Sequence, residues 1–166
     1  MKKALLALLI MLAVLIPALV ACTGNNPGGN DGTTTGVQVP EEKTFDLTGY
    51  KVIRGFKPTP TSELIKGIGE LRNSIQENLG LDLRYEDDYL EDGDSEDNHP
   101  KEIVIGNTSR TATAEARKEL TDGSRFIIKT VGDRIVILGT SDDETLKGVK
   151  YFNEHFIKNG SDGKFK

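Results

Sequence analysis

The sequence has a single cysteine and no tryptophan, and it carries only two histidines in 166 residues. One cysteine permits no disulfide bond within the chain. The histidines, His99 and His155, have no cysteine or second histidine at the spacing of a structural zinc site. We therefore expect no metal centre and no cofactor, and a fold that is stabilised by its hydrophobic core alone.

An excess of basic residues is also missing. The chain has 21 Lys and Arg against 26 Asp and Glu, a formal charge of −5. A surface of this sign repels phosphate backbones and anionic lipids, so nucleic acid is not an expected partner. No phosphate-loop motif occurs, and Gly139-Thr140-Ser141 lacks the final glycine of a hydrolase nucleophile motif. We expect no catalytic residues and classify the chain as a non-enzyme.

The N-terminus has the layout of an export signal, with Lys2 and Lys3 before an apolar run over residues 4–20. The run ends in Leu-Val-Ala-Cys22, which resembles the lipobox of bacterial lipoproteins. The resemblance implies that residues 1–21 are a signal peptide and that Cys22 becomes a lipidated N-terminus, carrying acyl chains such as palmitate. The protein would then be held by its lipid on the outer side of the bacterial cell membrane.

The alternative is an uncleaved signal anchor, because about 17 apolar residues nearly span a bilayer. Pro17 and the lack of a charged stop after Cys22 favour cleavage. Loss of Lys2 and Lys3 would reduce the 21 basic residues to 19 against 26 acidic ones, a formal charge of −7. Charge would not attract such a protein to anionic lipid, so its membrane attachment would depend on the lipid.

The remaining chain divides into a linker and one domain. Residues 22–44 comprise Cys22 and a stretch rich in Gly, Asn, Thr and Pro, a composition typical of a flexible linker. Its root-mean-square reach is about 25 Å, which would keep the domain close to the membrane. Residues 45–166 have an ordinary size for a single domain.

The hydrophobic pattern of this domain predicts five strands and three helices. The expected strands are 50–54, 81–85, 102–106, 124–131 and 134–138. The expected helices run from the Thr59-Pro60 cap to Gly80, over about 112–120, and onward from the capping box at Ser141. The order β-α-β-β-α-β-β-α indicates an α+β fold, a two-layer sandwich of a mixed sheet and three helices.

Several segments together are similar to a known module. They are Tyr50–Arg54, Glu102–Arg110, Phe126–Lys129, Gly132–Gly139 and Thr145–Phe152. They resemble the non-catalytic N-terminal α+β domain of β-N-acetylhexosaminidases and α-glucuronidases. In those enzymes the catalytic residues lie on a barrel that follows this domain, whereas this sequence ends at Lys166. The resemblance therefore implies a carbohydrate-related lineage and transfers no catalytic residue.

The turn after residues 102–106 is the candidate ligand-binding site. Asn107, Thr108, Ser109 and Arg110 follow the end of a strand, where ligands often bind, and the Arg110 guanidinium suits a sugar acid or another carboxylate. The alternative is architectural, since the same residues can turn the chain and cap the next helix. The two interpretations differ in whether loss of Arg110 weakens binding or stability.

The stretch 86–97 holds eight carboxylates. A calcium loop that starts at Asp92 would need glycine where Asp97 stands and a glutamate at its twelfth position, so the specific motif fails. We expect a solvated, self-repelling loop. Non-specific binding of divalent ions is the alternative.

These observations favour a non-catalytic accessory lipoprotein that is associated with carbohydrate or cell-envelope processing. Its partners would be the membrane, through the lipid, and a glycan or a glycan-processing protein. The alternative is a truncated or split glycoside hydrolase whose catalytic barrel lies on another chain.

Overall fold

The computed structural model describes residues 44–120 and 125–166. The predicted signal peptide, the lipidation residue Cys22 and the linker up to residue 43 lie outside the described residues. In the two described ranges, no helix combines the length and the hydropathy that crossing a membrane would require.

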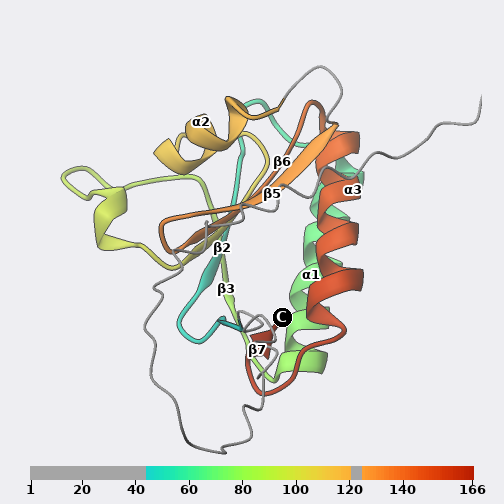
Figure 1. The fold of residues 1–166 in the computed structure, drawn as a ribbon. Helices are drawn as coiled ribbons and strands as arrows, with labels where there is room; N and C mark the ends of the chain where they lie inside the picture. The colour runs from blue at the N-terminus through green and yellow to red at the C-terminus, as the bar shows by residue number, and fades with distance from the viewer. Residues whose placement is uncertain (1–43, 121–124) are drawn as a thin grey trace, which may run out of the picture. The chain divides into compact units, whose positions relative to one another are not determined.

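Five strands form the main sheet, in the spatial order β3-β2-β4-β6-β5 (Figure 1). The bounds are β2 (Lys51–Arg54), β3 (Arg84–Asp87), β4 (Glu102–Ile105), β5 (Phe126–Val131) and β6 (Arg134–Gly139). β2 pairs in parallel with β3 and β4, and β4 pairs in parallel with β6. The β5–β6 hairpin is antiparallel, and Gly132 in its turn has a positive φ of 58°. The mixed sheet of the sequence prediction is confirmed.

The helix ends follow local capping signals. α1 (Ser62–Leu79) begins after Thr61, whose hydroxyl accepts a hydrogen bond from the Leu64 amide, and it ends at Gly80 in the left-handed conformation. α3 (Asp142–Phe152) begins after Ser141, which caps the Glu144 amide. The Gly80 end and the Ser141 cap agree with prediction. The first cap does not, because it is Thr61 and not Thr59.

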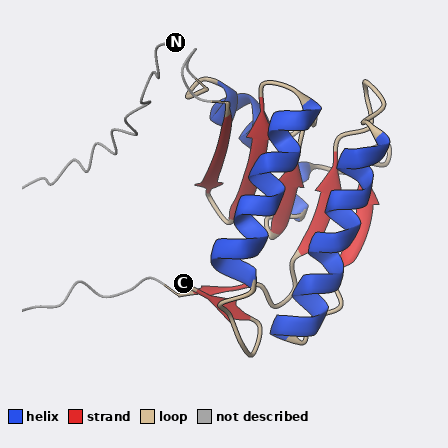
Figure 2. Cartoon of the chain, turned by 90° about the vertical axis from the view of Figure 1, so that its right-hand side faces the viewer, coloured by secondary structure: helices blue, strands red, loops and turns tan. Residues whose placement is uncertain are grey.

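One face of the sheet carries α1 and α3, which lie side by side (Figure 2). Their apolar stripes meet neighbouring side chains of β2, β4 and β6, since Val52 pairs with Ile103 and Ile103 with Ile135. The spacing of three and four residues predicts an apolar stripe on α1 made of Leu64, Ile65, Ile68, Leu71, Ile75 and Leu79. All of these are buried except Ile65, which is 38% exposed. This layer holds most of the buried hydrophobic residues.

The short helix α2 (Thr111–Arg117) packs on the opposite face (Figure 1). Its buried Ala112 and Ala116 contact Val104, Val136 and Leu138, and their small side chains let the helix approach the sheet. The expected sheet-and-helix sandwich holds for α1 and α3, and α2 adds a partial third layer. Side chains alternate along a strand, so Val104 and Val136 must face away from the main core.

The two chain ends of the described region meet in a small ribbon that the sequence pattern did not predict. β1 (Phe45–Asp46) pairs antiparallel with β7 (Lys164–Phe165), and the two phenylalanine rings stack at 5.3 Å. The Gly163 amide also donates to the Leu79 carbonyl at the end of α1. The residues before Lys166 are therefore an ordered part of the fold.

Candidate functional site

The most unusual side chain in the described region is a fully buried glutamate at the start of β4. Glu102 is 0% exposed and accepts hydrogen bonds from Arg110 Nε at 3.1 Å, Arg110 Nη2 at 3.2 Å and Arg134 Nε at 3.0 Å. Lys51 Nζ lies 3.7 Å from Glu102 Oε1. A buried carboxylate is tolerated only with such compensation.

Arg110 is buried as deeply as its partner, at 2% exposure. Its Nη1 donates to Asp88 Oδ1 at 2.8 Å, so each of its three nitrogens has a carboxylate partner. Burial by itself would lower the pKa of Arg110, but the adjacent Glu102 carboxylate outweighs it and raises that pKa above its usual value. We call Lys51, Asp88, Glu102, Arg110 and Arg134 the Glu102 cluster.

The four residues of the predicted ligand turn are close together, and each makes contacts within the chain. Asn107 donates to the Lys57 carbonyl and accepts from Arg117, while the Thr108 hydroxyl bonds that of Thr113. The amide and hydroxyl of Ser109 both donate to Asp88. Because Arg110 is also committed to carboxylates, this geometry favours the architectural interpretation of the turn.

The acidic stretch 86–97 is folded onto the rest of the structure. Five of its eight carboxylates have partners, and these are Glu86 with Lys51, Asp87 with Arg54, Asp88 with Arg110, Asp94 with His99 and Glu96 with the Thr111 amide. The prediction of self-repulsion was wrong for these five, although Asp87 remains half exposed to solvent. Cations and backbone N–H groups from distant segments balance their charge.

Arg134 and Glu96 hold this loop against the rest of the fold. Arg134 Nη2 donates to the Glu96 and His99 carbonyls, and Glu96 caps the N-terminus of α2, where a carboxylate is favourable. In the part of the chain that the structure describes, no group of three or more His, Cys, Asp or Glu could hold a metal ion.

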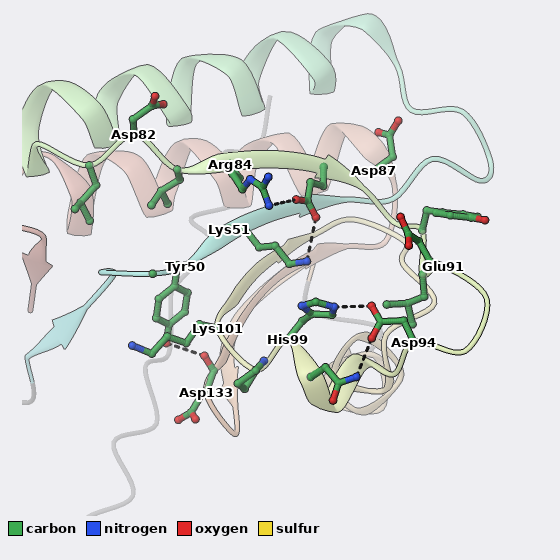
Figure 3. Close-up of a pocket in the computed structure, with 18 residues that line it drawn as sticks. Tyr50, Lys51, Asp82, Arg84, Asp87, Glu91, Asp94, His99, Lys101 and Asp133 are labelled. Atoms are coloured by element: carbon green, nitrogen blue, oxygen red, sulfur yellow. Dashed lines mark hydrogen bonds and ion pairs between the residues drawn. The ribbon is translucent and has the colours of Figure 1, made fainter.

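Beside the Glu102 cluster the surface has a hollow of about 1130 Å³, formed by residues 49–51, 81–84, 86–87, 89–91, 94 and 98–101 with Asp133 (Figure 3). We call it the β3 hollow, because β3 contributes Arg84, Glu86 and Asp87 to it. Lys51 pairs with Arg84 and Glu102 in register, so these three side chains project from the α2 face of the sheet. The hollow therefore lies on that face, beyond the reach of α2.

The long axis of the hollow joins two unlike ends. Tyr50, Lys101 and Asp133 lie at one end, and Glu91 and Asp94 lie at the other (Figure 3). The Tyr50 hydroxyl donates to the Asp133 carbonyl at 2.7 Å, and burial raises the pKa of Tyr50, so this hydroxyl stays protonated at neutral pH.

The far wall is built on the contact between His99 Nε2 and Asp94 Oδ2, at 2.6 Å. Asn98 also donates to Asp94, at 2.8 Å. Together with the Ser95 amide, these bonds lower the pKa of Asp94 to about 2. The wall therefore carries a carboxylate that is ionised at any physiological pH.

Sequence reasoning missed the hollow, although it noticed most of the segments that form it. Two of the four tyrosines, Tyr50 and Tyr89, line it. Tyr85 instead packs against the main core, and Tyr151 lies on α3 next to His155. A local signal was present in Glu102, a charged residue that opens an otherwise apolar strand.

Over residues 44–120 and 125–166 the structure thus defines an α+β fold with a five-stranded mixed sheet, three α-helices and a charged hollow on one face. No family model matches the chain, and neither does any curated protein. Among solved structures, "Structure of CpGH84D", from glycoside hydrolase family 84, matches with a TM-score of 0.48 and 15% identity. The match covers 75% of this chain and 20% of that one, so this chain spans a small part of that structure.

Proposed function

We propose that this protein is a lipid-anchored bacterial lipoprotein whose α+β domain is a non-catalytic accessory module, associated with carbohydrate at the cell envelope. The observation that carries the anchoring is the apolar run over residues 4–20 that ends in Leu-Val-Ala-Cys22. The thiol of Cys22 is the only one in the chain, so it is the sole acceptor available for a thioether-linked lipid.

The accessory role is supported by what the charged side chains of the domain do. Arg110, Glu102 and Asp88 neutralise one another and fix the chain around them. A catalytic acid or base needs access to substrate. Side chains buried in mutual ion pairs lack this access, so we assign them to structure and assign binding to the β3 hollow.

The test of anchoring is Cys22→Ala in the full-length protein, expressed with labelled palmitate in a bacterial host. We expect the variant to lose the label and to accumulate as an uncleaved precursor, because the acyl acceptor is gone. Thr23→Ala is the matched control and should be labelled and processed normally. Unchanged mature mass and unchanged membrane fractionation in Cys22→Ala would contradict the proposal.

The carbohydrate association is tested separately, by binding of the detergent-solubilised full-length protein to purified peptidoglycan and to a panel of envelope and extracellular glycans. We expect retention on at least one of these. Absence of retention on all of them would remove the carbohydrate part and leave the anchoring part intact.

A further inference from the structure

The β3 hollow combines three kinds of surface within one concavity. Hydrogen-bond donors come from Arg84, Lys101 and Asn98, acceptors come from Glu86 and Asp94, and apolar area comes from two tyrosine rings and from Leu81, Leu90 and Pro100. Small-molecule sites are typically concave, with volumes of roughly 300–1,000 Å³. At about 1130 Å³ the hollow has room for several linked rings.

A ligand that satisfies such a lining must both donate and accept hydrogen bonds along its length, and it must also present apolar faces. Sugar hydroxyls do both, because each has one donor and two acceptor positions. The C–H faces of a pyranose ring pack on aromatic rings such as that of Tyr89, which is 67% exposed. Tyr50 and Glu91 lie on opposite sides of the lining in Figure 3, so a linear oligomer could contact both.

The charge of the lining selects among oligosaccharides. Three cations, Lys51, Arg84 and Lys101, contribute to the hollow. They face six carboxylates, which are Asp82, Glu86, Asp87, Glu91, Asp94 and Asp133. Arg72 and Arg54, which lie outside the lining, pair with Asp82 and Asp87, so four carboxylates remain against the three cations. Lys51 is already paired with Glu86 at 3.0 Å and lies next to Glu102. The excess of negative charge disfavours uronic acids and other anionic sugars.

Two sides of the hollow are fixed before any ligand arrives. Its floor at Lys51 is held by the Glu102 cluster, and the wall at Asp94 is held by His99 and Asn98. A lining that is already ordered loses little conformational entropy on binding. The Glu102 cluster would thus serve the hollow by placing its floor, and Lys51 is the member of the cluster that lines it.

We infer that the β3 hollow is a binding site for neutral or cationic oligosaccharides. This inference rests on the proposed association with carbohydrate and deepens it, and it reverses the preference for acidic sugars that Arg110 suggested.

The test is isothermal titration of the full-length protein in detergent at low ionic strength with three tetrasaccharides. They are cellotetraose, which is neutral, a chitosan tetramer, which is cationic, and tetragalacturonate, which is anionic. We expect the first two to bind, and tetragalacturonate to bind at least about tenfold more weakly because of like-charge repulsion.

Two variants locate the site. Tyr89→Ala removes an exposed ring, and Arg84→Ala removes a side chain that is 85% exposed, so neither should disturb the fold. We expect Tyr89→Ala to weaken cellotetraose binding about fivefold, the size of one lost ring contact. The matched controls are Tyr151→Ala, an exposed tyrosine on α3, and Lys66→Ala, an exposed cation on α1. Both should bind like the parent protein.

The possible failures are distinguishable. Strongest binding of tetragalacturonate, or equal weakening by Tyr89→Ala and Tyr151→Ala, would overturn the site while carbohydrate binding itself stands. Retention on the glycan panel, together with unchanged cellotetraose affinity in Tyr89→Ala and Arg84→Ala, would also overturn the site and leave carbohydrate binding intact. No heat change with any tetrasaccharide at about 100-fold the protein concentration would overturn the inference, and the panel result would then decide the proposed function.

Discussion

The two faces of the central sheet are closed in different ways. On one face, Ile103, Ile105, Ile135 and Ile137 pack against the apolar stripes of α1 and α3. On the other face, α2 covers Val104 and Val136, and the rest is closed by the ion pairs of the Glu102 cluster. The same strands supply both faces, because alternate side chains point in opposite directions.

The two faces differ in how strictly they fix the positions of the loops and side chains packed against them. Apolar packing is non-directional and tolerates substitutions that conserve volume, so it stabilises the fold without fixing a single arrangement of loops. A buried carboxylate must find partners at hydrogen-bond distance, so Glu102 fixes where Arg110 and Arg134 lie. Through Asp88 and the Glu96 carbonyl, these arginines then fix the loop that forms one side of the hollow.

The largest expected effect comes from removing the arginine at the centre of the charged face. Arg110→Ala leaves the buried Asp88 and Glu102 carboxylates short of a cation, which we expect to cost about 3–5 kcal/mol of unfolding free energy. Urea denaturation of the variant measures it. Arg72 is the matched control, since it also pairs with an aspartate at 2.8 Å but on the surface, and Arg72→Ala should cost less than about 1 kcal/mol.

The same variant separates the two interpretations of the turn at residues 107–110. An architectural Arg110 predicts lower stability, and any loss of affinity for the tetrasaccharides would follow from displacement of the loop that Arg110 fixes. A ligand-binding Arg110 predicts near-normal stability and a loss of acidic-sugar binding of about 1.5–3 kcal/mol. Near-normal stability would therefore argue against the cluster as the holder of this face.

The apolar face is tested at Leu71, which is 1% exposed in the middle of α1. Leu71→Ala should cost about 2–5 kcal/mol, because it removes buried area and leaves a cavity. Ile65→Ala on the same helix, where the side chain is partly exposed, should cost much less. Equal losses at the two positions would mean that α1 is rotated relative to the structure described here.

The smallest effect is local and depends on pH. The pKa of Asp94 is lowered to about 2 by Asn98, His99 and the Ser95 amide, so its bonds contribute fully above pH about 4 and are lost as the pH falls from about 4 to about 2. The protection of the amides of residues 95–99 against hydrogen exchange, relative to the intrinsic exchange rate at each pH, should therefore fall over that range. Asp94→Asn should abolish the dependence, and Asp92→Asn should keep it. An exchange midpoint near 4 would contradict the lowered pKa.

Much of the apolar face could be predicted, because its signals are local. The spacing of Leu64, Ile68, Leu71 and Ile75 depends only on the helical repeat, and all four are buried. Gly80 and Ser141 end and begin helices through their own conformations and hydroxyls. Ile65 was wrongly included, since a residue at the edge of the stripe is buried only if a neighbouring element covers it.

The charged face could not be predicted in the same way. Arg110 lies 22 residues from Asp88, and Arg134 lies 32 residues from Glu102. Considered without the rest of the chain, eight carboxylates between 86 and 97 indicate repulsion. Only the fold brings cations or backbone N–H groups from distant segments to five of them. The bounds of β3 were also mispredicted. The strand was expected at 81–85 and runs over Arg84–Asp87, because pairing with β2 sets its register.

The sequence by itself determined the helices, the β5–β6 hairpin, the mixed α+β class and the lipidation prediction at Cys22, because each depends on residues that are near one another along the chain. Tertiary structure alone decided that Glu102 and Arg110 are buried together, that the acidic loop is held against the sheet, and that a hollow opens beside β3. The physical reason is that ion pairs and concave surfaces depend on distances between segments far apart in sequence, and strand pairing is what sets those distances.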